Sequence, residues 1–306
     1  MFITNNKVIG VNQTRGRNMD ILVLGGTRFF GIPMVNELIS KGHDITIATR
    51  QNARDDFGDK VKRIKVERTD AESMKRAFDG KYYDVVIDKI AYCSYDIKYA
   101  MDALAFGKYI YMSTTSVYDP KHFDTKESDF DGIHRTWKWC GRFDAPYEEI
   151  KRQAECALWQ EYADKNWLAV RYPFVAGRDD YTQRLRFYVE HVMKEMPMYI
   201  DNINDPMGFI RSDEAGAFLA YLVDQEANGA VNGSASGTIS MREVLAYVEG
   251  KTGKKAVLAD DGEAAPYNGE PAYSINTEKA ERLGFCFSQL RDWIFELIDH
   301  YIDDIR

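Results

Sequence analysis

The chain has 306 residues, of which 45% are hydrophobic, 29% charged and 13% aromatic, as in ordinary globular proteins and unlike disordered or collagen-like chains. A formal net charge of -8 argues against extended binding to nucleic acid, which requires a basic surface. No run of about 18 apolar residues could cross a membrane, so we expect a cytoplasmic protein without a membrane partner.

The first 18 residues precede the first predicted strand, and we interpret them as an N-terminal extension outside the core. From residue 20 to about residue 177, apolar runs of strand length alternate with segments of helical period. The predicted strands are residues 21–24, 44–50, 60–68, 84–92 and 108–118, and the predicted helices are residues 32–39, 71–78, 96–106 and 146–163. This alternation requires crossover connections, so it predicts an α/β fold with a doubly wound, Rossmann-type parallel sheet over residues 19–177.

The pattern is looser beyond Gly177. The helices predicted there are residues 183–194, 213–224, 241–250 and 290–302. We interpret residues 178–306 as a smaller, substrate-binding lobe, with an approximate boundary and lobes that can interleave. Within the first lobe, residues 119–144 form a long polar and aromatic connection, and connections of that length are usually functional or disordered.

Ligands of doubly wound sheets bind at the carboxyl ends of the strands. The first predicted strand ends in the run ILVLGGTRFFG, in which Gly25, Gly26 and Gly31 could form the tight turn that brings a pyrophosphate to a helix N-terminus. Arg28 stands where the spacing would put a middle glycine, so the strict dinucleotide pattern is absent. A glycine turn without a ligand is the alternative.

The end of the second predicted strand indicates which dinucleotide is preferred. An acidic residue there would hold the ribose hydroxyls of NAD, but this strand ends in Thr49 and Arg50. Arg50 suits a 2'-phosphate, and Arg28 could join it, so we expect NADP to be preferred over NAD. A solvated arginine is the alternative at either position.

Tyr147 and Lys151 are four residues apart in a predicted helix and therefore lie on one face. A nearby ammonium can lower the pKa of a phenol, which is otherwise near 10. The same spacing recurs at Tyr247 and Lys251, which we assign to a solvated helix face. Upstream of Tyr147, a predicted strand brings Ser113, Thr114 and Thr115 to the carboxyl edge of the sheet, where a hydroxyl could hydrogen-bond a substrate or cap a turn.

Six segments, GGTRFFG, VVIDKIAY, STTSVY, PYEEIKRQAE, RYPFVAG and FIRSDEAGAFL, occur in this order between about residues 19 and 301. In order and spacing they resemble the extended short-chain dehydrogenase/reductases of the NAD-dependent epimerase/dehydratase family. The resemblance implies hydride exchange between an alcohol or ketone carbon and a nicotinamide. It also implies a small-molecule substrate, commonly a nucleotide sugar, and a possible homodimer built on the helix that carries Tyr147.

The same resemblance implies roles for individual residues. Thr114 takes the Ser/Thr position, Tyr147 is the acid/base, and Lys151 orients the nicotinamide ribose and lowers the pKa of the tyrosine. Glu67 or Asp70 would approach the adenine. The complete set of candidate cofactor-binding residues is Gly25, Gly26, Thr27, Arg28, Phe29, Phe30, Gly31, Arg50, Glu67, Asp70, Ala91, Tyr92, Tyr147, Lys151, Tyr172 and Pro173.

Substrate-binding candidates outside these motifs are charged or aromatic. Arg178, Arg184, Arg186 and Arg211 could bind a diphosphate, although solvated arginines on helix faces are the default interpretation. Arg211 is the better candidate because it follows an apolar run. His134 could be a second proton-transfer group beside Trp137 and Trp139, although such residues more often pack a loop onto the surface. The four cysteines are widely spaced, without C-x-x-C pairs or nearby histidines, so we expect no metal site and no disulfide framework.

Three departures from the family pattern keep a second interpretation open. Arg28 replaces the middle glycine, Asp119 follows Val-Tyr where glycine is usual, and the segment of residues 119–144 is enlarged. The variant turn resembles an atypical branch that includes the chloroplast stem-loop RNA-binding proteins. The chain is therefore either an enzyme or a non-catalytic dinucleotide-binding or RNA-associated protein. Thr114, Tyr147 and Lys151 favour the enzyme, because a pure binder would not need them.

Overall fold

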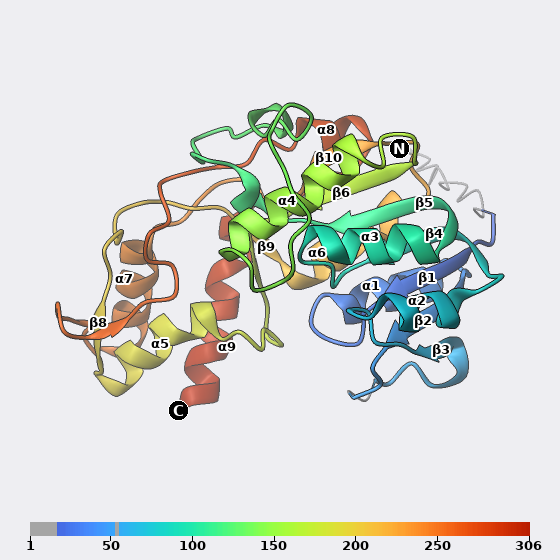
Figure 1. Cartoon of the computed structure of the whole chain (residues 1–306). Coiled ribbons are helices and arrows are strands. Elements are labelled where there is room, and N and C mark those ends of the chain that lie inside the picture. Colours follow the sequence, from blue (N-terminus) through green and yellow to red (C-terminus); the bar gives the residue numbers. More distant parts are fainter. Residues whose placement is uncertain (1–16, 53–54) are drawn as a thin grey trace, which may run out of the picture.

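The main feature of the fold is a seven-stranded parallel sheet in the order β10-β6-β5-β4-β1-β2-β3 (Figure 1). The computed structural model describes residues 17–52 and 55–306, so nearly all of the predicted N-terminal extension lies outside the described residues. The strands of the sheet are β1 (Asp20–Leu24), β2 (Asp44–Thr49), β3 (Val61–Lys65), β4 (Tyr82–Asp88), β5 (Ala105–Met112), β6 (Trp167–Arg171) and β10 (Gly229–Asn232). The predicted α/β class is confirmed.

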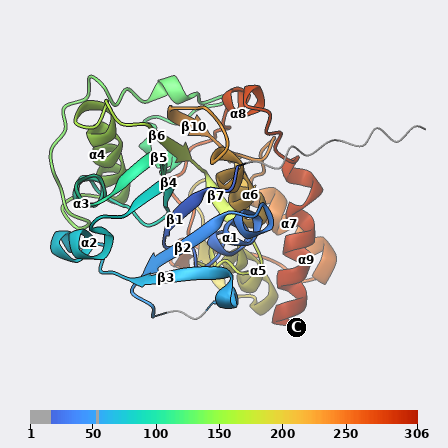
Figure 2. The same cartoon turned by 90° about the vertical axis from the view of Figure 1, so that its right-hand side faces the viewer.

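Helices cover both faces of this sheet (Figure 2). One face carries α1 (Gly31–Ser40) and α6 (Ser212–Leu222), and the other carries α2 (Ala71–Phe78), α3 (Ser94–Ala103) and α4 (Tyr147–Gln160). Side chains of β1 alternate between these two cores, with Ile21 and Val23 in the first and Leu22 and Leu24 in the second. Burial on both faces explains why the strand is continuously apolar in sequence.

Strands β4 and β5 end four and six residues earlier than the sequence predicts, and polar side chains cause both endings. The carboxylate of Asp88 accepts a hydrogen bond from the backbone N–H of Ile90 (3.1 Å), which turns the chain out of β4. The hydroxyl of Thr114 accepts one from the N–H of Ser116 (3.1 Å) and begins a single 3-10 turn, η2 (Thr115–Val117). Residues 89–92 and 113–118 therefore form loops at the carboxyl edge of the sheet rather than further strand.

The smaller lobe has its own core, to which three helices contribute side chains: α5 (Arg184–Lys194), α7 (Met241–Thr252) and α9 (Ile294–Ile305). A three-stranded sheet of β8 (Pro197–Tyr199), β11 (Val257–Leu258) and β12 (Glu263–Ala264) lies beside them, and the pair β7 (Phe174–Ala176) and β9 (Phe209–Arg211) follows the last turn of the first lobe.

Beyond the approximate boundary predicted at residues 177 and 178, the two lobes interleave along the chain. After β9, helix α6 packs on α1, and β10 pairs with β6 at the edge of the large sheet. The chain thus returns to the first lobe before it completes the second one. Gly216 in α6 permits this return, because a Cβ atom there would lie 2.7 Å from the carbonyl oxygen of Phe30.

Residues 119–144 are called the strap below, and the second half of the strap packs against α3 and α4. The hydroxyl of Ser94 donates a hydrogen bond to the carbonyl of Lys138 (3.1 Å), and the N–H of Lys138 donates to the side chain of Gln153 (2.6 Å). All residues of α4 from Ile150 to Leu158 are buried. A dimer built on α4 would therefore have to contact the strap.

Within residues 17–52 and 55–306, no helix combines the length and the apolar character needed to cross a membrane.

Candidate functional site

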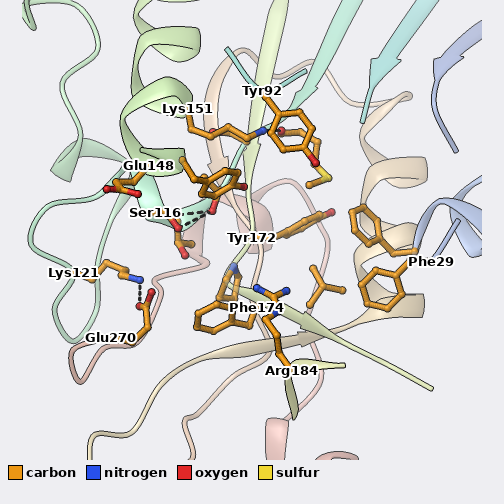
Figure 3. A pocket seen from close by; sticks show the side chains of 18 of the residues that line it. Phe29, Tyr92, Ser116, Lys121, Glu148, Lys151, Tyr172, Phe174, Arg184 and Glu270 are labelled. Atoms are coloured by element: carbon orange, nitrogen blue, oxygen red, sulfur yellow. Dashed lines mark hydrogen bonds and ion pairs between the residues drawn. The ribbon is translucent and has the colours of Figure 1, made fainter. Parts of the chain in front are cut away.

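A cavity of about 390 Å³ lies between the two lobes at the carboxyl edge of the large sheet. Its walls come from the glycine turn, from the loops after β4 and β5, from the start of α4 and from the smaller lobe. Figure 3 shows Tyr92 and Lys151 on one side of this space, with Lys121, Phe174 and Arg184 across from them. This is the position at which doubly wound sheets bind ligands.

The glycine turn between β1 and α1 has a backbone that requires glycine. Gly25 and Gly26 have φ values of 96° and 92°, in the left-handed region. At Gly31 a Cβ atom would lie 2.7 Å from the carbonyl oxygen of Gly26. The two aromatic residues of this turn, Phe29 and Phe30, are buried and line the cavity, so the turn opens directly onto the cavity.

Tyr147 and Lys151 reach the same cavity from the first turns of α4. The ammonium of Lys151 donates hydrogen bonds to the carbonyls of Ala91 (2.8 Å) and Met112 (2.9 Å), at the ends of two neighbouring strands, and lies 5.9 Å from the centre of the Tyr147 ring. Thr114 lines the cavity beside them and is largely buried. The three predicted catalytic residues are therefore brought together.

Desolvation dominates the acid–base behaviour of this group. It raises the pKa of Tyr147 to about 12, although 44% of this residue is exposed, and the largest opposing effect is a hydrogen bond with Thr114 rather than the charge of Lys151. Desolvation also lowers the pKa of Lys151 to about 7, against the attraction of Asp88 and Asp96. At neutral pH the phenol is thus fully protonated, and Lys151 is close to its midpoint.

The loop after β4, which carries Ala91 and Tyr92, is held by a buried charge network that the sequence did not suggest. Arg68 forms ion pairs with Asp88 and Asp96 and donates a further hydrogen bond to the Asp96 carbonyl (2.7 Å). Arg142 of the strap donates to the Asp96 carboxylate (3.0 Å) and to the carbonyl of Ile90 (3.0 Å). The strap therefore supports the wall of the cavity from outside.

The other predicted cofactor residues lie in several environments. Ala91 is buried, while Tyr92 and Pro173 line the cavity. Tyr172 also lines the cavity, but its hydroxyl is buried and donates to the carbonyl of Ala215 (2.7 Å), which joins the sheet to α6. Thr27 is half-buried in the glycine turn, where Arg28 is exposed.

At the carboxyl ends of β2 and β3, Arg50 and Glu67 are exposed. A hydrogen bond from Thr69 is the main cause that lowers the pKa of Glu67, and the charge of Arg50 contributes in the same direction. Asp70 has a structural role as well, since its carboxylate accepts the N–H of Glu72 (3.0 Å) and caps α2.

The far wall of the cavity combines residues from the strap and the smaller lobe. Lys121 of the strap forms an ion pair with Glu270, and its ammonium lies 4.5 Å from the centre of the Tyr273 ring (Figure 3). Arg184 stacks its guanidinium 5.0 Å from the centre of the Phe174 ring. Sequence reasoning missed Lys121 and Glu270, because these two residues are 149 positions apart and belong to no common motif.

Of the four arginines considered as diphosphate ligands, Arg184 alone lines this cavity. Arg178 pairs with Glu296 (3.1 Å) and Arg211 pairs with Asp213 (2.5 Å) beside a separate depression, and Arg186 pairs with Asp304 (3.1 Å). The structure does not bring Arg178 or Arg211 to Tyr147.

The aromatic part of the strap also lies away from the cavity. Trp137 and Trp139 contact each other edge to face (4.7 Å) and pack against the core beside α3 and α4, and His134 is exposed and bonded to Asp131 (2.7 Å). The packing interpretation therefore describes these residues.

Comparisons with known proteins agree with this architecture. A family model described as the NAD dependent epimerase/dehydratase family matches residues 21–205. A curated relative, the chloroplast stem-loop binding protein of 41 kDa b from Arabidopsis thaliana, is 24% identical over 225 residues, which is 68% of this chain and 56% of that protein. The match thus spans little more than half of the relative.

Solved structures with the same fold extend over nearly the whole chain. A putative epimerase from Burkholderia cenocepacia is 18% identical with a TM-score of 0.72, over 94% of this chain and 100% of its own. A UDP-glucose 4-epimerase from Thermotoga maritima, solved with UDP-glucose, is 16% identical with a TM-score of 0.72 over the same shares. A UDP-glucose 4-epimerase from Thermus thermophilus, in complex with NAD, is 18% identical with a TM-score of 0.66, over 92% of this chain and 98% of its own.

Proposed function

Because this chain belongs to the NAD dependent epimerase/dehydratase family, we propose that it is an NAD(P)-dependent enzyme that acts on a nucleotide sugar or a similar polyol, with Tyr147 as its acid/base. The observation that carries this proposal is the meeting of two distant segments at one cavity. Phe29 and Phe30 of the glycine turn line the same space as Tyr147 and Lys151 of α4. A nicotinamide cofactor, when bound, exchanges a hydride with a carbon of the substrate.

The chain's own residues would control the accompanying proton. With a pKa of about 12, Tyr147 is a neutral phenol at pH 7 and can donate a proton to a substrate oxygen. To act as a base, Tyr147 requires a lower pKa. A protonated Lys151, released from the carbonyls of Ala91 and Met112, could provide this by moving closer to the phenol. Thr114 supplies a hydroxyl next to the same oxygen.

The far wall favours a substrate with both hydroxyl groups and negative charge. Lys121 and Glu270 present paired donors and acceptors, and Arg184 has no carboxylate partner within the part of the chain that the structure describes. An arginine that stacks on an aromatic ring while its donors remain available suits a phosphate or a carboxylate. The structures solved with UDP-glucose have the same fold, which supports a nucleotide sugar as the substrate class.

The proposal predicts turnover by the full-length protein. Incubation with NAD or NADP and a panel of UDP-sugars should change the substrate, either in the configuration of a carbon or by loss of water, and NMR of the sugar would detect both. If the protein binds NAD(P)H but changes no member of a broad panel of sugars and polyols, while stem-loop RNA binds tightly, the proposal would be wrong.

RNA association is the second candidate function, and the stem-loop binding relative is the observation in its favour. The net charge of -8 opposes it, because contacts with phosphates require basic residues. Gel-shift titration with stem-loop RNA at physiological salt tests this candidate directly.

We also propose that NADP is preferred over NAD. Arg50 and Arg28 are exposed at the strand end and at the glycine turn, and a 2'-phosphate would give Arg50 a charge-assisted hydrogen bond. Arg50→Ala should weaken NADPH binding about tenfold and change NADH binding little, since such a bond contributes about 1.5–3 kcal/mol. Fluorescence titration measures both affinities. An unchanged ratio of affinities in the variant would contradict the preference, and Arg63→Ala, at an arginine paired with Asp55, is the control.

A further inference from the structure

Lys89 places a cation between the glycine turn and the cavity. It is the first residue after β4, its backbone N–H donates to the carbonyl of Leu24 at the end of β1 (3.1 Å), and its side chain lines the cavity. A Cβ atom built on Gly25 would lie 3.7 Å from the Cβ atom of Lys89, so the lysine stem starts directly beside the turn.

The ammonium of Lys89 lies over the ring of Phe30, 3.8 Å from its centre. Across residues 17–52 and 55–306, it has neither an ion-pair partner nor a hydrogen-bond acceptor. Desolvation lowers its pKa to about 8, and Asp179 opposes this shift from beyond ion-pair distance. A cation–π contact compensates only in part for lost hydration.

The other two lysines of the cavity differ from Lys89 in this respect. Lys121 is neutralised by Glu270, and Lys151 donates to the two carbonyls of Ala91 and Met112. Lys89 therefore has unused donors in a partly desolvated position. An anion that entered the cavity beside the glycine turn would supply both the acceptors and the opposite charge.

We propose that Lys89 is an additional phosphate-binding residue, which moves from the ring of Phe30 to the pyrophosphate of a bound dinucleotide. The inference rests on the proposed function. It adds a positive charge next to the glycine turn, which the contacts of the turn itself do not supply. Its location selects the pyrophosphate, because Phe30 immediately precedes α1 and free N–H groups at a helix N-terminus attract that group. Arg28 lies in the turn but is exposed, so the ammonium of Lys89 would supply the positive charge in its place.

The test compares the wild-type chain with Lys89→Met by calorimetric titration. ADP-ribose, which contains the pyrophosphate, should bind about tenfold more weakly to the variant, whereas adenosine should bind within about twofold of wild type. Lys89→Arg, which retains the charge, should restore most of the ADP-ribose affinity. Lys98→Met, which removes a lysine paired with Asp102 on the surface of α3, is the matched control and should bind like wild type.

Each contrary result has a distinct meaning. Equal binding of ADP-ribose by wild type and Lys89→Met would overturn the inference and leave the proposed function intact. A loss confined to UDP-glucose would assign Lys89 to the substrate and would also overturn it. A parallel loss for ADP-ribose and adenosine would show a structural role instead. If the wild-type chain bound neither ADP-ribose nor NADPH, the proposed function itself would fail, and the inference with it.

Discussion

Two helices of this protein carry a tyrosine followed four residues later by a lysine, and the two pairs have opposite environments. In α4, Tyr147 and Lys151 open onto the cavity between the lobes, and the lysine is buried with carbonyl oxygens as its acceptors. In α7, Tyr247 and Lys251 both donate to the carboxylate of Asp299 on α9 (3.0 and 2.9 Å), and Lys251 is exposed.

The same spacing therefore produces opposite electrostatic results. Desolvation lowers the pKa of Lys151 to about 7, whereas hydrogen bonding with Tyr247 and Asp299 raises the pKa of Lys251. Spacing along a helix determines only that two side chains are neighbours. Their chemistry is determined by what the rest of the chain packs around them, here the ends of two strands for one pair and a carboxylate for the other.

Removal of the phenol oxygen should distinguish the two Tyr-Lys pairs most strongly, because it should affect turnover in one pair and not in the other. Tyr147→Phe should lower turnover about 100- to 10,000-fold, the range for loss of a general acid or base, and should leave NAD(P)H affinity within about twofold. Tyr247→Phe should leave turnover unchanged. Steady-state kinetics on a substrate found in the sugar panel, together with cofactor titration, measures both effects.

Comparable activity of the two tyrosine variants would remove the distinction on which the catalytic assignment depends. A loss of cofactor binding in Tyr147→Phe would instead assign the phenol to binding rather than to proton transfer.

The lysines should differ in how they couple stability to pH. Lys151 has a pKa of about 7 in the folded chain and about 10.4 when unfolded, so between these values the unfolded chain binds more protons. The contribution of Lys151 to the free energy of unfolding therefore rises with pH from about 7 upward. The rise is at most about 1.4 kcal/mol per pH unit. Urea unfolding at pH 6.5, 7.5, 8.5 and 9.5 should show that the free energy of unfolding of wild type increases relative to that of Lys151→Met over this interval.

Lys251 should behave in the opposite way. Its raised pKa gives a stabilisation that is fully present below the unfolded value and is lost only as pH rises through the higher folded value. The free energy of unfolding of Lys251→Met should therefore change with pH in parallel with that of wild type from pH 6.5 to 9.5. Parallel curves for Lys151→Met as well would mean that the ammonium of Lys151 is hydrated in solution.

The comparison also shows which parts of the site a sequence can predict. The glycine turn, Thr114, Tyr147 and Lys151 were predictable, because each belongs to a short segment whose period or spacing fixes its geometry. The alternation of apolar runs gave the parallel sheet for the same reason. Local patterns also distinguished the two Tyr-Lys pairs, since only the first follows a strand that ends in hydroxyl residues.

The far wall of the cavity could not be predicted in this way. Lys121 and Glu270 meet only because the strap and the smaller lobe converge, and Arg184 differs from Arg178 and Arg211 only in what lies nearby. The latter two were candidate ligands beside the default of solvated arginines, and both pair with carboxylates in their own vicinity. Likewise, α6 and β10 return to the first lobe through contacts that no local pattern records.

The smallest expected effect concerns the structural role of the second pair. Tyr247 and Lys251 share Asp299 as their acceptor and so connect α7 to α9 at the surface. Tyr247→Phe should lower the free energy of unfolding by less than about 1 kcal/mol, because a half-exposed hydrogen bond competes with water. A double-mutant cycle with Asp299→Ala, followed by urea unfolding, should show that the losses are not additive, since both variants remove the same hydrogen bond. No loss in Tyr247→Phe would mean that Tyr247 stabilises α7 through its ring, which packs 4.5 Å from that of Phe295 and remains in the variant, rather than through its hydroxyl.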